Sequence, residues 1–201
     1  MNNDPAFPVE NPFCTRRIRP GALPFLFPPG KGLETILDRL RGAAGWGEII
    51  GPHGSGKSTL LAGLLPLLQA EGWQVERIDL HDGERRLPVD LRQIPETEKP
   101  LLLVVDGYEQ LGSLSRLHLK RHCRRRGWGL IVTAHRSAGL SELCNTASTL
   151  EQANRVVEEL LKNSEYTVSP QEIADRYARC QGNLREMLFE LYDLFEQRRT
   201  S

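Results

Sequence analysis

The residue types best suited to chemistry cluster in one short segment, residues 51–59. Its Gly51, Gly56, Lys57 and Ser58 satisfy the pattern G-x-x-x-x-G-K-[ST]. Glycines let successive backbone N–H groups turn inward around an anion, and a following helix N-terminus adds partial positive charge. A lysine there neutralises nucleotide β- and γ-phosphates, and the next hydroxyl can ligate Mg²⁺. The candidate nucleotide-binding residues are Gly51, Pro52, His53, Gly54, Ser55, Gly56, Lys57, Ser58 and Thr59.

The surroundings of this segment favour the phosphate-binding interpretation. Residues 48–50 are typical of a strand, and residues 59–61 open a helical pattern. The alternative is a glycine-rich turn that only connects a strand to a helix. A chance match at all the constrained positions, in the correct strand–helix context, is rare.

A carboxylate suited to the metal side of such a site follows the aliphatic run at residues 101–105. Asp106 ends this predicted strand. Ligands of parallel sheets bind at the carboxyl ends of the strands, so we expect Asp106 to face a Mg²⁺ ion held by Ser58. Ser58 and Asp106 are therefore the candidate metal ligands. The alternative is a strand that ends in aspartate because of its turn.

Hydrolysis needs a further group that orients or deprotonates the attacking water. Glu109 is the nearby carboxylate after Asp106, and it is the candidate base unless it points to solvent. The predicted strand at 129–132 is followed by Thr133 and His135. A polar side chain there would lie between the two phosphate-binding strands, so Thr133 is the first candidate near the γ-phosphate and His135 the second. The alternative is a strand end that satisfies its own backbone.

Short apolar runs alternate with helical patterns through the middle of the chain. Strands are predicted near 46–51, 74–80, 101–106, 128–134 and, more weakly, 147–150. Helices are predicted near 32–41, 57–70, 113–125 and 139–144. Such alternation predicts βαβ units on a parallel sheet with helices on both faces. The expected fold is α/β, a three-layer αβα sandwich with a central parallel sheet and a small C-terminal helical lid.

The two ends of the chain differ from its middle. Residues 1–32 hold seven of the thirteen prolines and several large apolar side chains, which predicts an extended arm laid on the domain that follows. Beyond residue 151 the strand signal vanishes. Ser169 and Asn183 begin helical patterns in the manner of cap residues. The predicted organisation is an arm at 1–32, a core at 33–150 and a helical subdomain at 151–201.

Composition bounds the remaining possibilities. Lys+Arg and Asp+Glu each total 26, so the formal net charge is zero, which argues against a generic polyanion-coating protein. The longest aliphatic run has five residues, far short of the roughly 20 that span a bilayer. Residues 1–4 do not resemble a signal peptide. No CxxC pair links the four cysteines, so we expect reduced thiols and a soluble cytoplasmic protein.

Taken together, these motifs resemble the AAA+ branch of the ASCE P-loop ATPases. Residues 182–186 are similar to the sensor-2 segment of an AAA+ lid, and the resemblance implies that Arg185 reaches the nucleotide phosphates. The alternative for Arg185 is a surface arginine in the first turn of a helix. Residues 11–13 and 25–27 look like the entry segment of general-secretion-type AAA ATPases.

The chain also departs from the AAA+ pattern. Asp106 is followed by Gly107, where typical AAA+ proteins have glutamate. Residues 105–111 look more like those of NACHT-like signalling NTPases, with Glu109 matching one acid and Gln110 replacing the next. Residues 138–149 contain no arginine, the residue that AAA+ rings present to a neighbouring subunit. This absence favours a monomer or weak dimer.

The expected function is Mg²⁺-dependent ATP hydrolysis of AAA+ type, coupled to a protein partner. The alternatives are a nucleotide-gated binding module with little or no hydrolysis, and a P-loop kinase or nucleic-acid-coupled ATPase. Residues 116–126 hold six Lys and Arg and no acid, which suits a solvated helix face, a protein contact, a nucleic-acid contact or an arginine lid of a kinase. The guanine motif of GTPases and the Leu-Ser-Gly-Gly motif of ABC ATPases do not occur.

Overall fold

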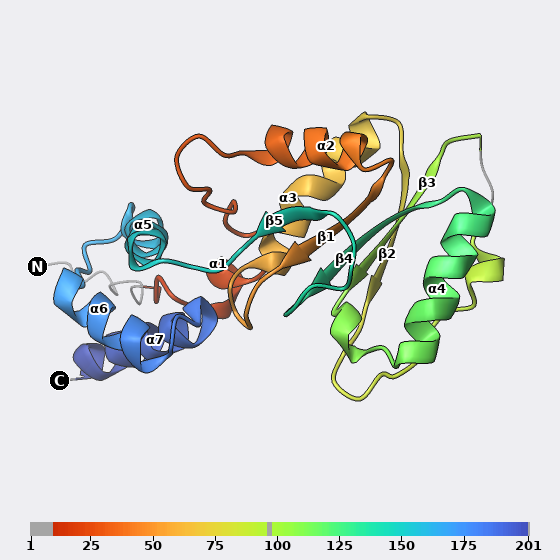
Figure 1. Ribbon diagram of the computed structural model, residues 1–201. Coiled ribbons are helices and arrows are strands. Elements are labelled where there is room, and N and C mark those ends of the chain that lie inside the picture. The colour runs from red at the N-terminus through yellow and green to blue at the C-terminus, as the bar shows by residue number, and fades with distance from the viewer. Residues whose placement is uncertain (1–9, 96–97, 201) are drawn as a thin grey trace, which may run out of the picture.

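A computed structural model describes residues 10–95 and 98–200 of the chain. Within these residues the strands form one five-stranded parallel sheet in the order β2-β3-β4-β1-β5 (Figure 1). The strands are β1 (Trp46–Ile50), β2 (Gln74–Asp79), β3 (Leu101–Asp106), β4 (Gly129–Ala134) and β5 (Glu142–Asn145). The predicted α/β class and parallel sheet are confirmed.

Helices cover both faces of this sheet. The helices α2 (Leu33–Gly42) and α3 (Lys57–Ala70) pack on one face, and α4 (Ser113–Arg126) lies on the other (Figure 1). Successive strand residues point to opposite faces, so Val104 contributes to the first layer and Val105 to the second. Burial on both sides explains why β3 and β4 read as continuous apolar runs.

The order of the strands brings the candidate site residues to one edge of the sheet. Strand β4 lies between β1, which leads into the glycine-rich loop, and β3, which ends at Asp106. Ile49 pairs with Thr133 across β1 and β4, while Val105 pairs with Val132 across β3 and β4. Thr133 and Asp106 therefore emerge side by side at the carboxyl ends of their strands.

The prediction around the fifth strand was wrong. Residues 142–145 form β5, which overlaps the predicted helix at 139–144, and the strand expected at 147–150 does not form. Strand β5 is a short edge strand in which Leu143 alone is buried, so it lacks the alternation that identifies a strand. The later residues instead begin a helix, because the Thr149 side chain accepts a hydrogen bond from the N–H of Gln152.

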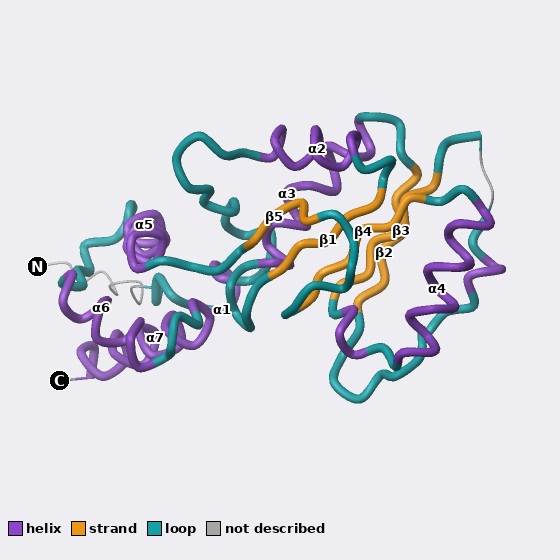
Figure 2. The backbone as a smooth tube through the Cα atoms, in the orientation of Figure 1, coloured by secondary structure: helices purple, strands orange, loops and turns teal. Residues whose placement is uncertain are grey.

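The C-terminal part consists of three helices joined by loops, α5 (Leu150–Leu161), α6 (Pro170–Arg179) and α7 (Leu184–Thr200) (Figure 2). These helices pack around an apolar cluster of their own. Ser169 caps α6 with a capping box as predicted. The Asn183 side chain accepts a hydrogen bond from the N–H of Glu186 at the start of α7. No helix of the described residues is long and apolar enough to cross a membrane.

The N-terminal arm bridges this helical part and the sheet domain. Phe13 is fully buried in the apolar cluster of α5–α7, whereas Phe25 and Phe27 pack on the α2–α3 layer. The arm is not extended throughout, because α1 (Thr15–Ile18) forms one helical turn. The part of the predicted arm at residues 1–9 lies outside the described residues. Two 3₁₀ turns, η1 (Leu91–Gln93) and η2 (Tyr108–Gln110), complete the fold.

Candidate functional site

The glycine-rich loop joins β1 to α3 and is shaped by two left-handed glycines. Gly54 has a φ of +67° and Gly56, the N-cap of α3, has a φ of +93°. A Cβ atom at Gly54 would stand 1.8 Å from Asn183 Oδ1, and one at Gly56 would stand 3.2 Å from the Phe25 ring. Glycine is thus required at both positions by backbone conformation and by close neighbours.

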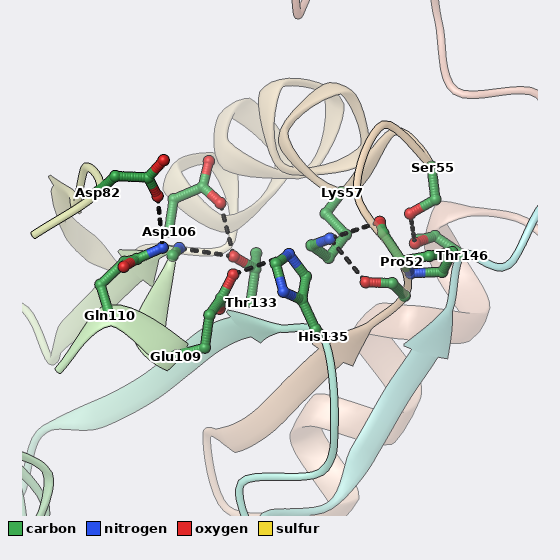
Figure 3. Close-up of polar contacts among 12 residues, drawn as sticks. Pro52, Ser55, Lys57, Asp82, Asp106, Glu109, Gln110, Thr133, His135 and Thr146 are labelled. Carbon is green, nitrogen blue, oxygen red and sulfur yellow. Dashed lines mark hydrogen bonds and ion pairs between the residues drawn. The ribbon is translucent and has the colours of Figure 1, made fainter. Parts of the chain in front are cut away.

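Lys57, the first residue of α3, folds back over this loop. Its ammonium donates to the carbonyl oxygens of Gly51 at 2.7 Å and Pro52 at 2.8 Å (Figure 3). Burial lowers the pKa of Lys57, while the charges of Glu109 and Asp106 oppose this shift. The lysine is held by neutral carbonyl groups, so its charge is directed at the loop that would hold an anion.

Asp106 is held in place by the strand beside it. The Thr133 hydroxyl donates to Asp106 Oδ1 at 2.6 Å and accepts a hydrogen bond from the Gly107 N–H at 2.9 Å (Figure 3). Thr133 is fully buried. The structure thus brings Thr133 against the carboxylate on the metal side of the candidate site.

Gly107 explains why no acid follows Asp106 directly. Its φ is +82°, and a Cβ atom there would stand 2.7 Å from the Leu80 carbonyl oxygen. A side chain at this position would be strained and would clash with backbone. The next acid that the chain can present is therefore Glu109, on η2.

The side chain of Glu109 has one paired oxygen and one free oxygen. Its Oε1 lies 3.0 Å from His135 Nε2, and its Oε2 is buried with no hydrogen-bond partner. The Glu109 carbonyl oxygen accepts a hydrogen bond from Arg116 at 2.6 Å, which fixes the backbone of η2. A carboxylate that lines the cavity is the kind of group that can act as a general base.

His135 connects Glu109 to the glycine-rich loop. Its ring lies 3.7 Å from the ring of His53, measured between centroids. Burial lowers the pKa of His135, and Lys57 and His53 lower it further against the opposing charge of Glu109. The imidazole is therefore neutral at pH 7. Because a carboxylate only accepts hydrogen bonds, the short contact requires His135 Nε2 to carry the proton.

Two candidate metal ligands line the same cavity. Ser58 and Asp106 offer a hydroxyl and a carboxylate, which are the hard oxygen donors that Mg²⁺ prefers. No cluster of three or more His, Cys, Asp or Glu suited to a metal ion occurs among the described residues. The donor set therefore fits a Mg²⁺ ion that takes its remaining ligands from phosphate and water, as is usual for this ion.

The helical part closes the site from the other side. Asn183 lies against Gly54, and the Arg185 Cβ atom would be 3.1 Å from a Cβ atom at Gly54. Arg185 lines the cavity, and its charge helps to lower the pKa of Lys57. Arg185 is thus at the glycine-rich loop. It is exposed, and among the described residues no hydrogen bond or ion pair joins it to Asp106 or Glu109.

These residues surround a cavity of about 1230 Å³, large enough for a nucleotide. It contains His53, Gly54, Ser55, Gly56, Lys57, Ser58, Thr59, Asp106, Glu109, Thr133, His135 and Arg185 from the predicted set. Gly51 and Pro52 are not among its lining residues, but their carbonyl oxygens accept hydrogen bonds from Lys57. Arm and lid residues supply an apolar part of the wall that the sequence did not predict: Pro20, Leu23, Phe25, Leu188 and Phe189.

Sequence reasoning also missed two polar residues of the site. Thr146, which follows β5, is buried and its hydroxyl lies 2.7 Å from the Ser55 hydroxyl (Figure 3). Arg77 of β2 lines the cavity and pairs with Asp106. Thr146 was missed because it follows the edge strand β5, which the sequence did not predict. Arg77 was missed because a charged residue in a strand is usually exposed to solvent, so its own segment gives no signal of a site.

The basic helix α4 lies outside the cavity. Arg121, Arg124, Arg125 and Arg126 are exposed, and among the described cavity-lining residues there is none from α4. Arg116 contributes only indirectly, through the Glu109 backbone. The arginine lid that a kinase would place over its phosphates is therefore not formed by this helix.

A scan of protein-family models and a search of curated proteins find no match to this chain. Among solved structures, a DNA replication initiation factor aligns with a TM-score of 0.56 and 14% sequence identity, covering 88% of this chain and 66% of that one. The replication initiator DnaA bound to AMPPCP and single-stranded DNA aligns with a TM-score of 0.55 and 15% identity, covering 83% of this chain and 61% of that one.

These likenesses, together with the strand order and the glycine-rich loop, define the class of fold. The chain has the fold of the AAA+ P-loop ATPases, so the resemblance predicted from the sequence is confirmed at the level of fold. The chain spans less than two thirds of the length of either of these structures.

Proposed function

We propose that this chain binds ATP with Mg²⁺ in the cavity and hydrolyses the bond between the β- and γ-phosphates. The observation that carries the proposal is the free Oε2 atom of Glu109, buried in the same cavity as Lys57 and Asp106. Mg²⁺, when bound, would neutralise phosphate charge and orient the terminal phosphate.

Each residue has a defined part in this proposal. Lys57 neutralises the β- and γ-phosphates, and Ser58 and Asp106 hold the metal. Glu109 accepts the proton of the attacking water on Oε2, while the contact with His135 Nε2, 3.0 Å away, keeps Oε1 in place. Thr133 orients Asp106 through its hydroxyl.

Coupling to a protein partner would pass through the helical part at 151–201, acting as a lid. Asn183 and Arg185 contact the tip of the glycine-rich loop at Gly54, so phosphates bound there meet both sides of the cavity. Arg185 adds a second positive charge that favours a closed lid when the anion is present. A ligand changes such an equilibrium only by contacting the two states differently, and these two side chains provide that difference.

Two substitutions separate binding from hydrolysis. Lys57→Ala should abolish binding of a fluorescent ATP analogue, whereas Glu109→Gln should retain binding and lower kcat by about 100-fold or more. Lys162→Ala and Glu158→Gln, at exposed positions of the helical part that do not line the cavity, are the matched controls and should change neither quantity. If Glu109→Gln turns over ATP at the wild-type rate, the proposed base is wrong. If the wild-type chain binds ATP without turnover, the nucleotide-gated binding module is the better description.

A second candidate function is coupling of the ATPase to single-stranded nucleic acid. It is favoured by helix α4, whose exposed Arg121 and Arg125 guanidinium groups form no ion pair or hydrogen bond with other described residues. Backbone phosphates are natural partners of such arginines. The test is the ATPase rate with and without single-stranded DNA at two salt concentrations. Stimulation that disappears in Arg121→Glu/Arg125→Glu supports this function, and an unchanged rate argues against it.

A further inference from the structure

The carboxylate on the metal side of the site already has a cationic partner. Arg77 Nη2 lies 3.2 Å from Asp106 Oδ2 and 2.6 Å from Asp79 Oδ1. The Arg77 Nε atom also donates to Asp79 Oδ1, at 2.7 Å. Asp79 and Asp106 are register partners on β2 and β3, so one guanidinium bridges two neighbouring carboxylates at the edge of the sheet.

Both oxygens of Asp106 are therefore occupied by donors. Oδ1 accepts the Thr133 hydroxyl and Oδ2 accepts Arg77. The Asp106 side chain is 14% exposed and that of Arg77 is 29% exposed, so water screens this pair less than it would at the surface. A metal ion that approaches Asp106 therefore meets the positive charge of Arg77, which is already hydrogen-bonded to one of its two oxygens.

We propose that Arg77 is the resident counter-ion of Asp106 in the nucleotide-free protein, and that it restricts the metal site to metal that arrives with phosphate. This inference rests on the proposed nucleotide site. Without a nucleotide, Asp106 and Ser58 would be the two protein ligands offered to Mg²⁺, and they lie beside the positive charge of Arg77. With a nucleotide, phosphate oxygens supply further ligands and negative charge, which makes displacement of Arg77 favourable.

The displaced arginine keeps an anchor. Its two contacts with Asp79 are shorter than its contact with Asp106, so the guanidinium group stays paired with Asp79 when Asp106 binds the metal. Without Arg77, Asp79 and Asp106 would be two adjacent carboxylates with no cation between them. Such a pair attracts a divalent ion in the absence of any nucleotide.

Binding of Mn²⁺ without nucleotide tests this inference, followed by the electron paramagnetic resonance signal of free Mn²⁺. The wild-type chain should bind Mn²⁺ weakly alone and more tightly when an ATP analogue is present. Arg77→Gln should bind Mn²⁺ without nucleotide about tenfold more tightly than wild type, or better. Arg92→Gln removes an arginine with an 85% exposed side chain and is the matched control, with no expected change. Arg77→Gln/Asp106→Asn should lose the gain.

Several outcomes overturn the inference. One is an Arg77→Gln variant with a native circular dichroism melt and no gain in Mn²⁺ affinity. Another is a gain that survives Asp106→Asn. If Arg77→Gln does not fold, the wild-type chain decides: equal Mn²⁺ affinity with and without the ATP analogue overturns the inference. A chain that binds nucleotide but shows one of these results leaves the proposed function standing, whereas failure to bind nucleotide at all defeats that function separately.

Discussion

At the scale of single residues, the proposed chemistry depends on the protonation state of His135. Burial and the neighbouring Lys57 and His53 lower its pKa from the ordinary value of 6.5, so the imidazole in contact with Glu109 is neutral at pH 7. Protonation would turn this contact into an ion pair. Glu109 would then be a weaker base, because the positive charge stabilises its ionised form.

We therefore expect ATP turnover to fall as the pH drops below 6.5. The folded state resists protonation of His135 more than the unfolded state does, so the free energy of unfolding should also decrease as the pH falls through the lowered pKa of this residue. His135→Gln keeps a donor and removes the titration. Comparison of pH–rate profiles and of Tm against pH for the two proteins measures the effect. A wild-type profile as flat below pH 6.5 as that of His135→Gln would contradict it.

The candidate site residues named from the sequence are those with a local signal. The glycine-rich loop carries its motif in adjacent positions, so its glycines, Lys57 and Ser58 could be named directly. Asp106 and Thr133 could be named because strand ends meet at one edge of a parallel sheet. Arg77 could not, since its importance depends on the pairing of β2 with β3 and on no feature of its own segment.

At the scale of elements, β1 carries a buried charge that organises the loop after β4. Glu48 is 1% exposed and accepts three hydrogen bonds, from the Ser137 hydroxyl at 2.6 Å and from the N–H groups of Ala138 at 2.7 Å and Leu140 at 3.2 Å. These bonds fix the loop that leads into β5. The edge strand is thus positioned by a side chain of its neighbour as well as by the backbone ladder.

Glu48→Gln should weaken this loop, because an amide offers one acceptor oxygen in place of two carboxylate oxygens and removes the charge. We expect the free energy of unfolding to fall by about 2 kcal/mol, measured by urea denaturation. Glu142→Gln, at an exposed position of β5, should change it by less than about 0.5 kcal/mol. Equal effects of the two substitutions would show that the buried hydrogen bonds contribute little.

The four longer strands and the helices α2, α3 and α4 were predicted close to their observed bounds, and β5 was not. A four-residue strand with one buried side chain has too few positions to display a period of two. Its pairing with β1 is a long-range contact, and the bulge between Glu48 and Ile49 changes its register. Such a strand is defined by its partner, which local sequence does not reveal.

At the scale of the whole molecule, the N-terminal arm connects the helical lid to the sheet domain. Phe13 is buried among α5–α7, and the side chain of Asn11 donates to the Tyr192 carbonyl oxygen at 3.1 Å. Further along the arm, the Leu26 and Phe27 carbonyl oxygens accept hydrogen bonds from side chains of α5. The arm is therefore part of the lid's packing at one end and of the cavity wall at the other.

Phe13→Ala should loosen the lid more than the sheet. Removing a fully buried phenyl ring costs about 3–5 kcal/mol of local stability. Hydrogen exchange measured by mass spectrometry should show lost protection in α5–α7 and retained protection in β3. Leu117→Ala, at a position that is 62% exposed on α4, is the control and should change neither region. Uniform loss of protection across the chain would mean that lid and sheet unfold as one unit.

Three parts of the chain bound the cavity, which bears on the rate at which a bound ligand leaves. Its wall is built from the arm, the glycine-rich loop and the lid, three segments distant in the chain that are tied together by hydrogen bonds and apolar packing. If the chain hydrolyses ATP as proposed, loosening of these contacts would widen the exit for ADP, and such openings limit turnover in many enzymes. We expect departure of ADP to set the pace of the catalytic cycle, so that a partner which pulls the arm aside would act as an exchange factor.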